Sequence, residues 1–241
     1  MKKLRDRQEQ WNQLARHDPF WAILASPGKR NRRWDPDEFF ATGRHEIEAV
    51  MRGIEDLGYP AARGRALDFG CGIGRNTQAL ADWFDHVTGV DISHAMLDLA
   101  QQHNRAPARC EYILNADGDL RTFPDASFDF VYSRLVLQHL PAHHARRHVR
   151  EFLRILRPSG LVLFQLPSRR HPRPAWQVLA SRAYNLLAGR ILRHPRVVEM
   201  NGVPREIIIR DVEECGGRIL NVRNDDGAGP TWENYLYAVR K

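Results

Sequence analysis

Short apolar runs alternate with polar stretches of helical periodicity through the centre of the chain. Runs of four to eight apolar residues bounded by turn residues are typical of buried strands. Five such runs lie between residues 62 and 168, at 65–69, 86–90, 110–115, 128–133 and 160–167. This alternation predicts an α/β fold, a mostly parallel sheet with helices on both faces.

The pattern changes on both sides of this centre. Residues 1–60 combine charge, tryptophan and helical spacing, and Asp35 followed by Pro36 is a strong helix start. After the centre we expect a helix over 204–215 and two closing strands, 218–224 and 234–240. The pattern therefore predicts an N-terminal helical cap at 1–60 and one domain over 61–241.

A basic, proline-bounded insertion follows the fifth strand, over about 168–200. Its apolar positions have helical spacing and its polar positions are rich in arginine. We interpret it as a lid over a substrate; a dimer contact, or a helix at 175–193 on a membrane surface, are the alternatives.

Composition narrows the class of protein. The chain has 241 residues, 43% of them hydrophobic, and only three cysteines, Cys71, Cys110 and Cys215, which form no C-x-x-C pair. We therefore expect neither a disulfide framework nor a metal site, and a reducing compartment. No stretch has the pattern of a signal peptide, and none reaches the roughly 20 apolar residues of a membrane span. The expected location is the cytoplasm.

The formal net charge is +7, and most of the positive charge is arginine. A basic balance is typical either of an anionic partner or of a solvated arginine surface. Because no basic and aromatic nucleic-acid motif accompanies the charge, we expect the solvated surface and no nucleic-acid partner.

The segment ALDFGCGIGRNT, residues 66–77, has three glycines in alternate positions, Gly70, Gly72 and Gly74. Glycine permits unusual backbone angles and close approach of a ligand. Arg75 stands where a dinucleotide-binding loop has its last glycine, so the match to a pyrophosphate site is poor. Asp91 ends the second strand, where a carboxylate can accept two ribose hydroxyls. A second acid, Asp117, follows the third strand and can accept an exocyclic amine.

These elements together resemble the class I S-adenosylmethionine-dependent methyltransferases. The resemblance covers roughly residues 45–168. It rests on D-x-G-x-G-x-G (68–74), G-V-D-I-S (89–93), A-D-G (116–118), F-P-D-A-S-F-D-F-V-Y-S (123–133) and L-R-P-S-G (156–160). It implies a Rossmann-like sheet of seven strands with the last one antiparallel, and S-adenosyl-L-methionine as cofactor.

The resemblance also implies roles for the loop residues. Asp68 is expected to orient the glycine loop and meet the amino group of the methionine moiety, which would lie on Gly70 and Gly72. The neighbouring Cys71 and Gly74 complete this part of the expected cofactor site.

Further cofactor contacts follow the next strands. Asp91 is expected at the ribose, with Ile92 on the adenine face, and Asp117 and Gly118 at the adenine edge. Ser133 is expected beside the methionine portion. Arg44, in the cap, is a candidate partner for the methionine carboxylate; an exposed position is the alternative.

His139 is the candidate general base, because it follows Ser133 by six residues and an imidazole titrates near neutral pH. A structural role beside the cofactor is the alternative. We expect His143, His144 and His148 to lie on a solvated helix face.

The sequence therefore predicts a methyltransferase for a small molecule, with O-methylation of a sugar or secondary-metabolite hydroxyl as the leading hypothesis. The alternatives are a nucleic-acid methyltransferase and a cofactor-binding module without turnover. Residues 133–136 lack the Pro-Pro-aromatic motif of enzymes that methylate exocyclic amines. The glycine spacing disfavours a dehydrogenase. The oligomeric state is left open.

Overall fold

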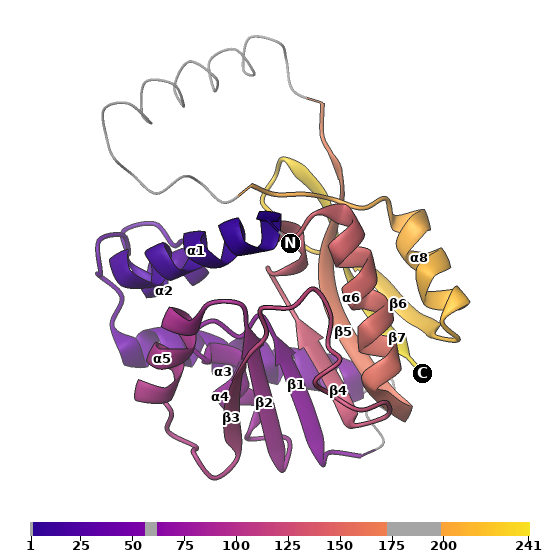
Figure 1. The fold of residues 1–241 in the computed structure, drawn as a ribbon, viewed down its shortest axis with the longest axis horizontal. Helices are drawn as coiled ribbons and strands as arrows, with labels where there is room; N and C mark the ends of the chain where they lie inside the picture. The colour runs from indigo at the N-terminus through magenta and orange to yellow at the C-terminus, as the bar shows by residue number, and fades with distance from the viewer. Residues whose placement is uncertain (1, 56–61, 173–198) are drawn as a thin grey trace.

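The computed structural model describes residues 2–55, 62–172 and 199–241. A single sheet of seven strands runs through the molecule in the order β3-β2-β1-β4-β5-β7-β6 (Figure 1). The strands are β1 (Arg65–Phe69), β2 (His86–Asp91), β3 (Cys110–Leu114), β4 (Phe128–Ser133), β5 (Leu156–Arg170), β6 (Arg218–Asn224) and β7 (Trp232–Arg240). β7 alone runs antiparallel to its neighbours, β5 and β6. The predicted sheet is confirmed.

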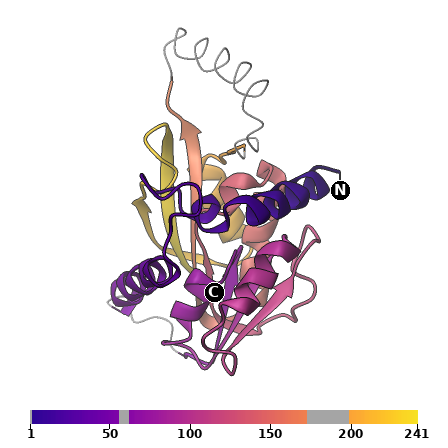
Figure 2. The same ribbon diagram turned by 90° about the vertical axis from the view of Figure 1, so that its left-hand side faces the viewer.

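Helices pack on both faces of the sheet (Figure 2). On one face, α3 (Pro36–Glu55) and α4 (Arg75–Leu80) bury residues such as Ile47, Met51 and Leu80 against the strands. On the other, α6 (Ala142–Ile155) and α8 (Arg205–Glu214) bury Phe152 and Ile208. Alternate residues of each strand face opposite sides, so both faces are apolar, as in other parallel sheets.

The N-terminal residues form α1 (Lys2–His17) and α2 (Pro19–Ile23), and α1 lies across the carboxyl ends of the parallel strands (Figure 1). A separate apolar cluster holds them there. Trp34, Phe39 and Phe40 are buried in it, together with Ile73 of the glycine loop and Met96 of α5 (His94–Gln102). These aromatic residues are therefore core of the cap.

Two expectations are corrected in detail. The connection from β3 to β4, residues 115–127, was expected to be helical but forms turns and bends, consistent with its Gly118 and Pro124. The insertion was expected to begin at 168, yet β5 continues to Arg170, which pairs with Trp232. Residues 173–198, including the proposed membrane-surface helix, lie outside the described residues.

β5 also begins earlier than predicted, at Leu156 and not at 160, whereas the helix boundaries after the cap agree with the structure. The carboxylate of Asp35 accepts a hydrogen bond from the Glu38 amide at 3.0 Å, as expected of an N-cap. The helix predicted over 204–215 is α8. Within the described parts of the chain, every helix is too short or too polar to cross a bilayer.

Candidate functional site

The glycine loop follows β1 at the carboxyl edge of the sheet. Its three glycines have φ values of +77°, +54° and +82°, which side chains other than hydrogen rarely tolerate. There is also no room for a Cβ. At Gly70 it would lie 2.3 Å from the Val136 side chain, at Gly72 2.6 Å from Ile23, and at Gly74 2.2 Å from the Tyr112 hydroxyl. The glycines are therefore required because side chains of the protein itself pack directly against the loop backbone.

Asp91, at the end of β2, holds the loop in place. One carboxylate oxygen accepts the Gly72 amide at 2.9 Å, and the other accepts the Ser93 amide at 2.8 Å. A carboxylate offers about four acceptor positions, so these two amides leave capacity for further donors. The free acceptor positions of Asp91 could therefore accept hydrogen bonds from two ribose hydroxyls.

Asp68 lies buried beneath the same loop. Its carboxylate accepts a hydrogen bond from the Thr77 hydroxyl at 2.7 Å. Burial raises the pKa of Asp68 to about 7, against the opposing effects of Thr77 and Arg75. Burial also raises the pKa of the adjacent Cys71 thiol well above its usual value, so this thiol stays neutral.

The helical cap is bound directly to this edge. The Gln8 amide donates to the Ile92 carbonyl at 2.9 Å, and the Ser93 hydroxyl donates to Asn12 at 2.7 Å. Ile23 of α2 covers Gly72. α1 therefore covers the region where the resemblance places the ribose and adenine, and α2 covers the loop expected to carry the methionine moiety.

The two residues expected at the adenine edge lie after β3. Asp117 is exposed, and a Cβ on Gly118 would be 3.2 Å from His144 and 3.3 Å from Leu4 of α1. Both thus lie at the same edge of the sheet as Asp91, beneath the first turn of the cap.

The segment after β4 forms the other wall of the site. Ser133 is buried, and among the described residues its hydroxyl has no hydrogen-bond partner. Leu135 has φ +62°, a left-handed conformation that costs a non-glycine residue about 1–3 kcal/mol. Its amide donates to Gln165 at 2.9 Å, and the next side chain, Val136, covers Gly70.

His139 lies in a short 3₁₀ helix, Leu137–His139, under the edge of Trp11, with ring centroids 5.4 Å apart. Its Nε2 lies 3.3 Å from the Gln138 amide nitrogen. Burial lowers its pKa to about 4, although the main chain of Glu199 acts in the opposite direction. The imidazole is therefore neutral near pH 7. Its role as base stays a prediction.

Of the three histidines of α6, His143 is exposed and His144 is half-buried. His148 was expected on a solvated face but is 2% exposed, packed on Phe69 with ring centroids 4.7 Å apart. His148 is buried because it lies on the inner face of α6, one turn after His144. Its Nδ1 lies 2.8 Å from the carbonyl oxygen of His144. Within the described chain, His, Cys, Asp and Glu side chains nowhere form a group that would hold a metal ion.

A charged network beneath the loop was not predicted from the sequence. Glu46 of α3 binds Arg75 at 2.8 Å, Arg134 at 3.2 Å and the Tyr132 hydroxyl at 2.7 Å. The two arginines outweigh burial and hold the pKa of Glu46 below its usual value. Arg44, two residues earlier, is exposed. The available signal was a glutamate one turn from Gly43 on the apolar face of an amphipathic helix.

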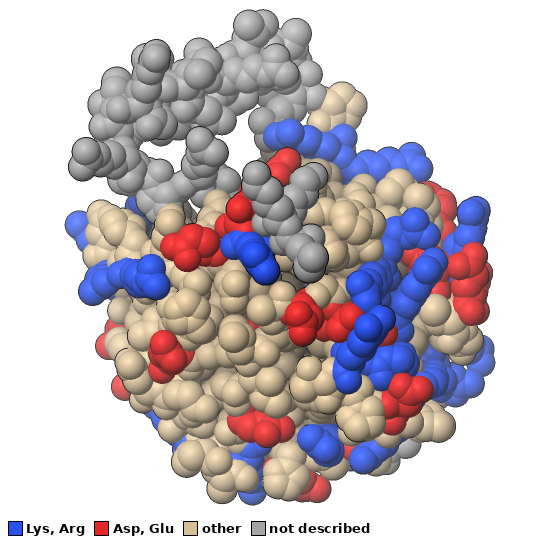
Figure 3. All heavy atoms as spheres, in the orientation of Figure 1, with Lys and Arg blue, Asp and Glu red and all other residues tan. Residues whose placement is uncertain are grey.

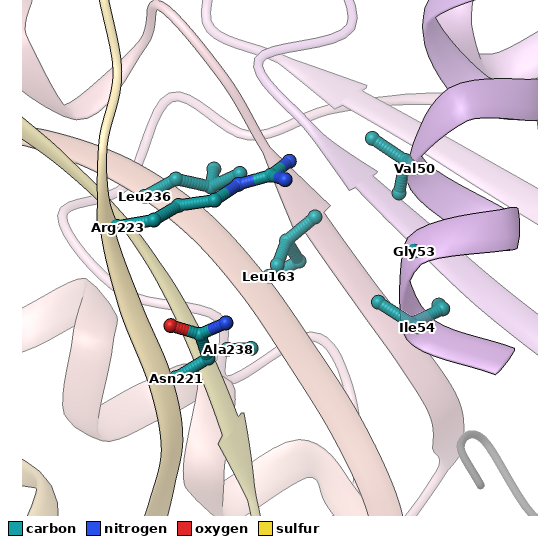
Figure 4. Close-up of a pocket in the computed structure, with 8 residues that line it drawn as sticks. All are labelled: Val50, Gly53, Ile54, Leu163, Asn221, Arg223, Leu236 and Ala238. Atoms are coloured by element: carbon teal, nitrogen blue, oxygen red, sulfur yellow. The ribbon is translucent and has the colours of Figure 1, made fainter. Parts of the chain in front are cut away.

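Figure 4 shows a pocket between α3 and the far half of the sheet. Val50 and Ile54 face Leu163 and Leu236 across it. Its volume is about 40 Å³, room for roughly one water molecule rather than a substrate. The carboxyl edge of the sheet remains the candidate site.

Sequence comparison matches the part of the chain that forms this edge to a protein family. Residues 67–164, from β1 to β5, match the methyltransferase domain family. The chain is 33% identical over 141 residues to a ubiquinone biosynthesis O-methyltransferase of Idiomarina loihiensis, covering 58% of this chain and 57% of that protein. It is 33% identical over 152 residues to a phosphoethanolamine N-methyltransferase of Triticum aestivum, covering 61% of this chain and 29% of that protein.

Structural comparison extends the likeness over the whole chain. Magnesium protoporphyrin IX methyltransferase from Synechocystis, solved with bound S-adenosylhomocysteine, superposes with a TM-score of 0.67 at 14% identity, covering 99% of both chains. At this identity the likeness establishes the fold. The methyltransferase-domain match and the similar solved structures support a class I S-adenosylmethionine-dependent methyltransferase. It spans between about a quarter and three fifths of the length of the curated relatives it matches.

The residues present fit the family's cofactor. Asp91 has acceptor capacity left, the Ser133 hydroxyl is buried and has no partner among the described residues, and the three loop glycines carry no side chains of their own. Ile23 and Val136 now cover the loop, so we expect both to shift when the cofactor enters.

Proposed function

We propose that this protein transfers the methyl group of S-adenosylmethionine to an oxygen of a small molecule, such as the hydroxyl of a sugar or secondary metabolite. The observation that carries the proposal is the joining of Asp91 to Gly72 at the carboxyl edge of a methyltransferase-family sheet. Bound there, the cofactor supplies an electrophilic methyl group on its sulfonium.

The chain's own residues have defined tasks in this proposal. Asp91 holds the ribose hydroxyls, Gly70 and Gly72 provide the backbone surface for the methionine portion, and Ser133 hydrogen-bonds beside it. Asp117 and Gly118 bind at the adenine edge. The cap excludes water, which favours transfer of the methyl group to the acceptor.

Similarity to enzymes of small molecules supports a small acceptor. The names of the relatives include a ubiquinone biosynthesis O-methyltransferase and, at 32% identity, a trans-aconitate 2-methyltransferase of Deinococcus radiodurans. The basic surface over α6 and α8 (Figure 3) is also balanced by acids. Arg146 and Arg150 both bind Asp211, and Arg147 binds Asp119. Such pairing leaves little free positive charge for a phosphate backbone.

Isothermal titration with S-adenosylmethionine and S-adenosylhomocysteine tests the cofactor. A screen of acceptor pools with isotope-labelled methyl donor, read by mass spectrometry, tests transfer and identifies the atom methylated. Binding without labelled product in any pool would favour a module without turnover, and absence of binding at millimolar ligand would refute the proposal.

His139→Ala tests the predicted base separately. Removal of a general base lowers kcat by about a hundred- to ten-thousandfold while cofactor binding is kept. Unchanged product formation would exclude His139 from that role.

A further inference from the structure

A chain of three buried amides leads from Asp225 in the β6–β7 hairpin to His139. The three are Asn234, Gln165 and Gln138. Gln165 lies in β5 and is fully buried, and Asn234 and Gln138 are at most 5% exposed. None belongs to the cofactor motifs, and only His139 was a candidate from the sequence.

The direction of the first hydrogen bonds follows from the chemistry of the groups. A carboxylate accepts only, so Asn234 donates its NH₂ to Asp225, at 3.0 Å. Asn234 therefore presents its oxygen to Gln165. The Leu135 main-chain amide donates only, and it meets the oxygen of Gln165 at 2.9 Å. Both neighbours thus require that the NH₂ of Gln165 point toward Asn234 and Gln138.

The same direction continues to the imidazole. The NH₂ of Gln165 donates to the Gln138 oxygen at 3.2 Å. Gln138 must then present its own NH₂ to Nε2 of His139, 3.3 Å away. A ring nitrogen that receives a donor carries a lone pair, so in the neutral imidazole the proton is on the other nitrogen, Nδ1. Nδ1 is buried and makes no direct hydrogen bond among the described residues, and the main chain of Glu199 lies near enough to the ring to favour an N–H there.

We infer that Gln138 and Gln165 are positioning residues that set the tautomer of His139, with the proton on Nδ1 and the Nε2 lone pair held by Gln138. His139 then offers a hydrogen-bond donor through Nδ1. It can accept a proton at Nε2 only if Gln138 turns away, and the links to Gln165 oppose that turn. The tautomer itself follows from the hydrogen bonds. Only its effect on methyl transfer rests on the proposed function.

Long-range ¹H–¹⁵N correlation spectra of the full chain, labelled with ¹⁵N-histidine, test this without any substrate. His139→Asn identifies the resonances among the 11 histidines. At pH 7 we expect the shift pattern of a protonated Nδ1 and an unprotonated Nε2. A protonated Nε2 in the unsubstituted protein would overturn the inference, whatever the outcome for cofactor binding.

Two variants test the chain itself. Gln138→Glu replaces the donor by an acceptor, and we expect a proton to appear on Nε2. Gln165→Met removes the link one residue away from His139, and we expect the single tautomer to become a mixture. Gln102→Glu, exposed on α5, carries the same charge change and should leave the His139 signals unshifted. An unchanged tautomer in both Gln138→Glu and Gln165→Met would overturn the role of the chain, since a structural role alone predicts no such shift.

Discussion

The carboxylate of Asp91 accepts the main-chain amide of Gly72 at 2.9 Å, and so joins the end of β2 to the loop that follows β1. The two residues are 19 positions apart in the chain. They meet because β1 and β2 are parallel neighbours, with Phe69 opposite Val90.

Asp91→Asn should weaken binding of S-adenosylhomocysteine. The substitution removes the charge from a group expected at the ribose, and hydrogen bonds to charged groups contribute about 1.5–3 kcal/mol. We expect a Kd about ten- to a hundredfold higher by isothermal titration. Asp98→Asn, exposed on α5, is the matched control and should leave the Kd unchanged. Equal Kd values for Asp91→Asn and the unsubstituted protein would remove Asp91 from the cofactor site.

Gly72→Ala should destabilise the fold for two separable reasons. A side chain at φ +54° is strained, and its Cβ would lie 2.6 Å from Ile23. Gly28→Ala reports strain alone, because Gly28 has φ +76° with nothing within 4 Å of its Cβ. In urea unfolding we expect Gly72→Ala to cost up to about 1 kcal/mol beyond Gly28→Ala, because the atom in the way is the end of the Ile23 side chain, which can shift.

Ile23→Ala should offset that additional cost in the double variant. A coupling free energy near zero in the double-mutant cycle would show that Ile23 does not cover Gly72 in solution.

Asp68 should make the protein less stable as pH rises from about 4 to about 7. Its folded pKa is raised to about 7 by burial, so over this range the unfolded chain loses the proton while the folded chain keeps it. The slope from this one group is at most about 1.4 kcal/mol per pH unit. Asp68→Asn removes this contribution to the slope. The difference in unfolding free energy between the unsubstituted protein and Asp68→Asn should therefore change with pH.

Urea unfolding at pH 5 and pH 7 measures this difference. Comparison with Asp68→Asn cancels the opposite contribution of His139 and His148, whose pKa values are lowered to about 4. A difference that is constant with pH would mean that Asp68 titrates normally.

Glu46→Gln should be among the most destabilising single substitutions. It leaves Arg75, whose side chain is 6% exposed, without a full negative charge. Breaking a buried ion pair in this way costs about 3–5 kcal/mol. Glu48→Gln, on the same helix, breaks only the exposed pair with Arg52 and should cost less than about 1 kcal/mol. Similar unfolding midpoints for the two variants would contradict the network.

The strands, the start of α3 after the N-cap Asp35 and the glycine loop were all predictable from local pattern. Burial on both faces gives a parallel strand a continuous apolar run, and an N-cap acid or a left-handed turn is chosen by the residue itself. The adjacency of Asp68, Gly72 and Asp91 followed as well, because parallel strands bring their carboxyl ends to one edge.

The contacts between distant segments were decided only by folding. Arg134 and Asp225 occur in loops where nothing in the local sequence marks them as partners. Gln165 interrupts an apolar run, but the run does not indicate which residues it will meet. Ile23 over Gly72 and Trp11 over His139 depend likewise on how the cap packs. A polar side chain buried in the interior must find a partner wherever the packing brings one, and the linear order of residues does not specify that place.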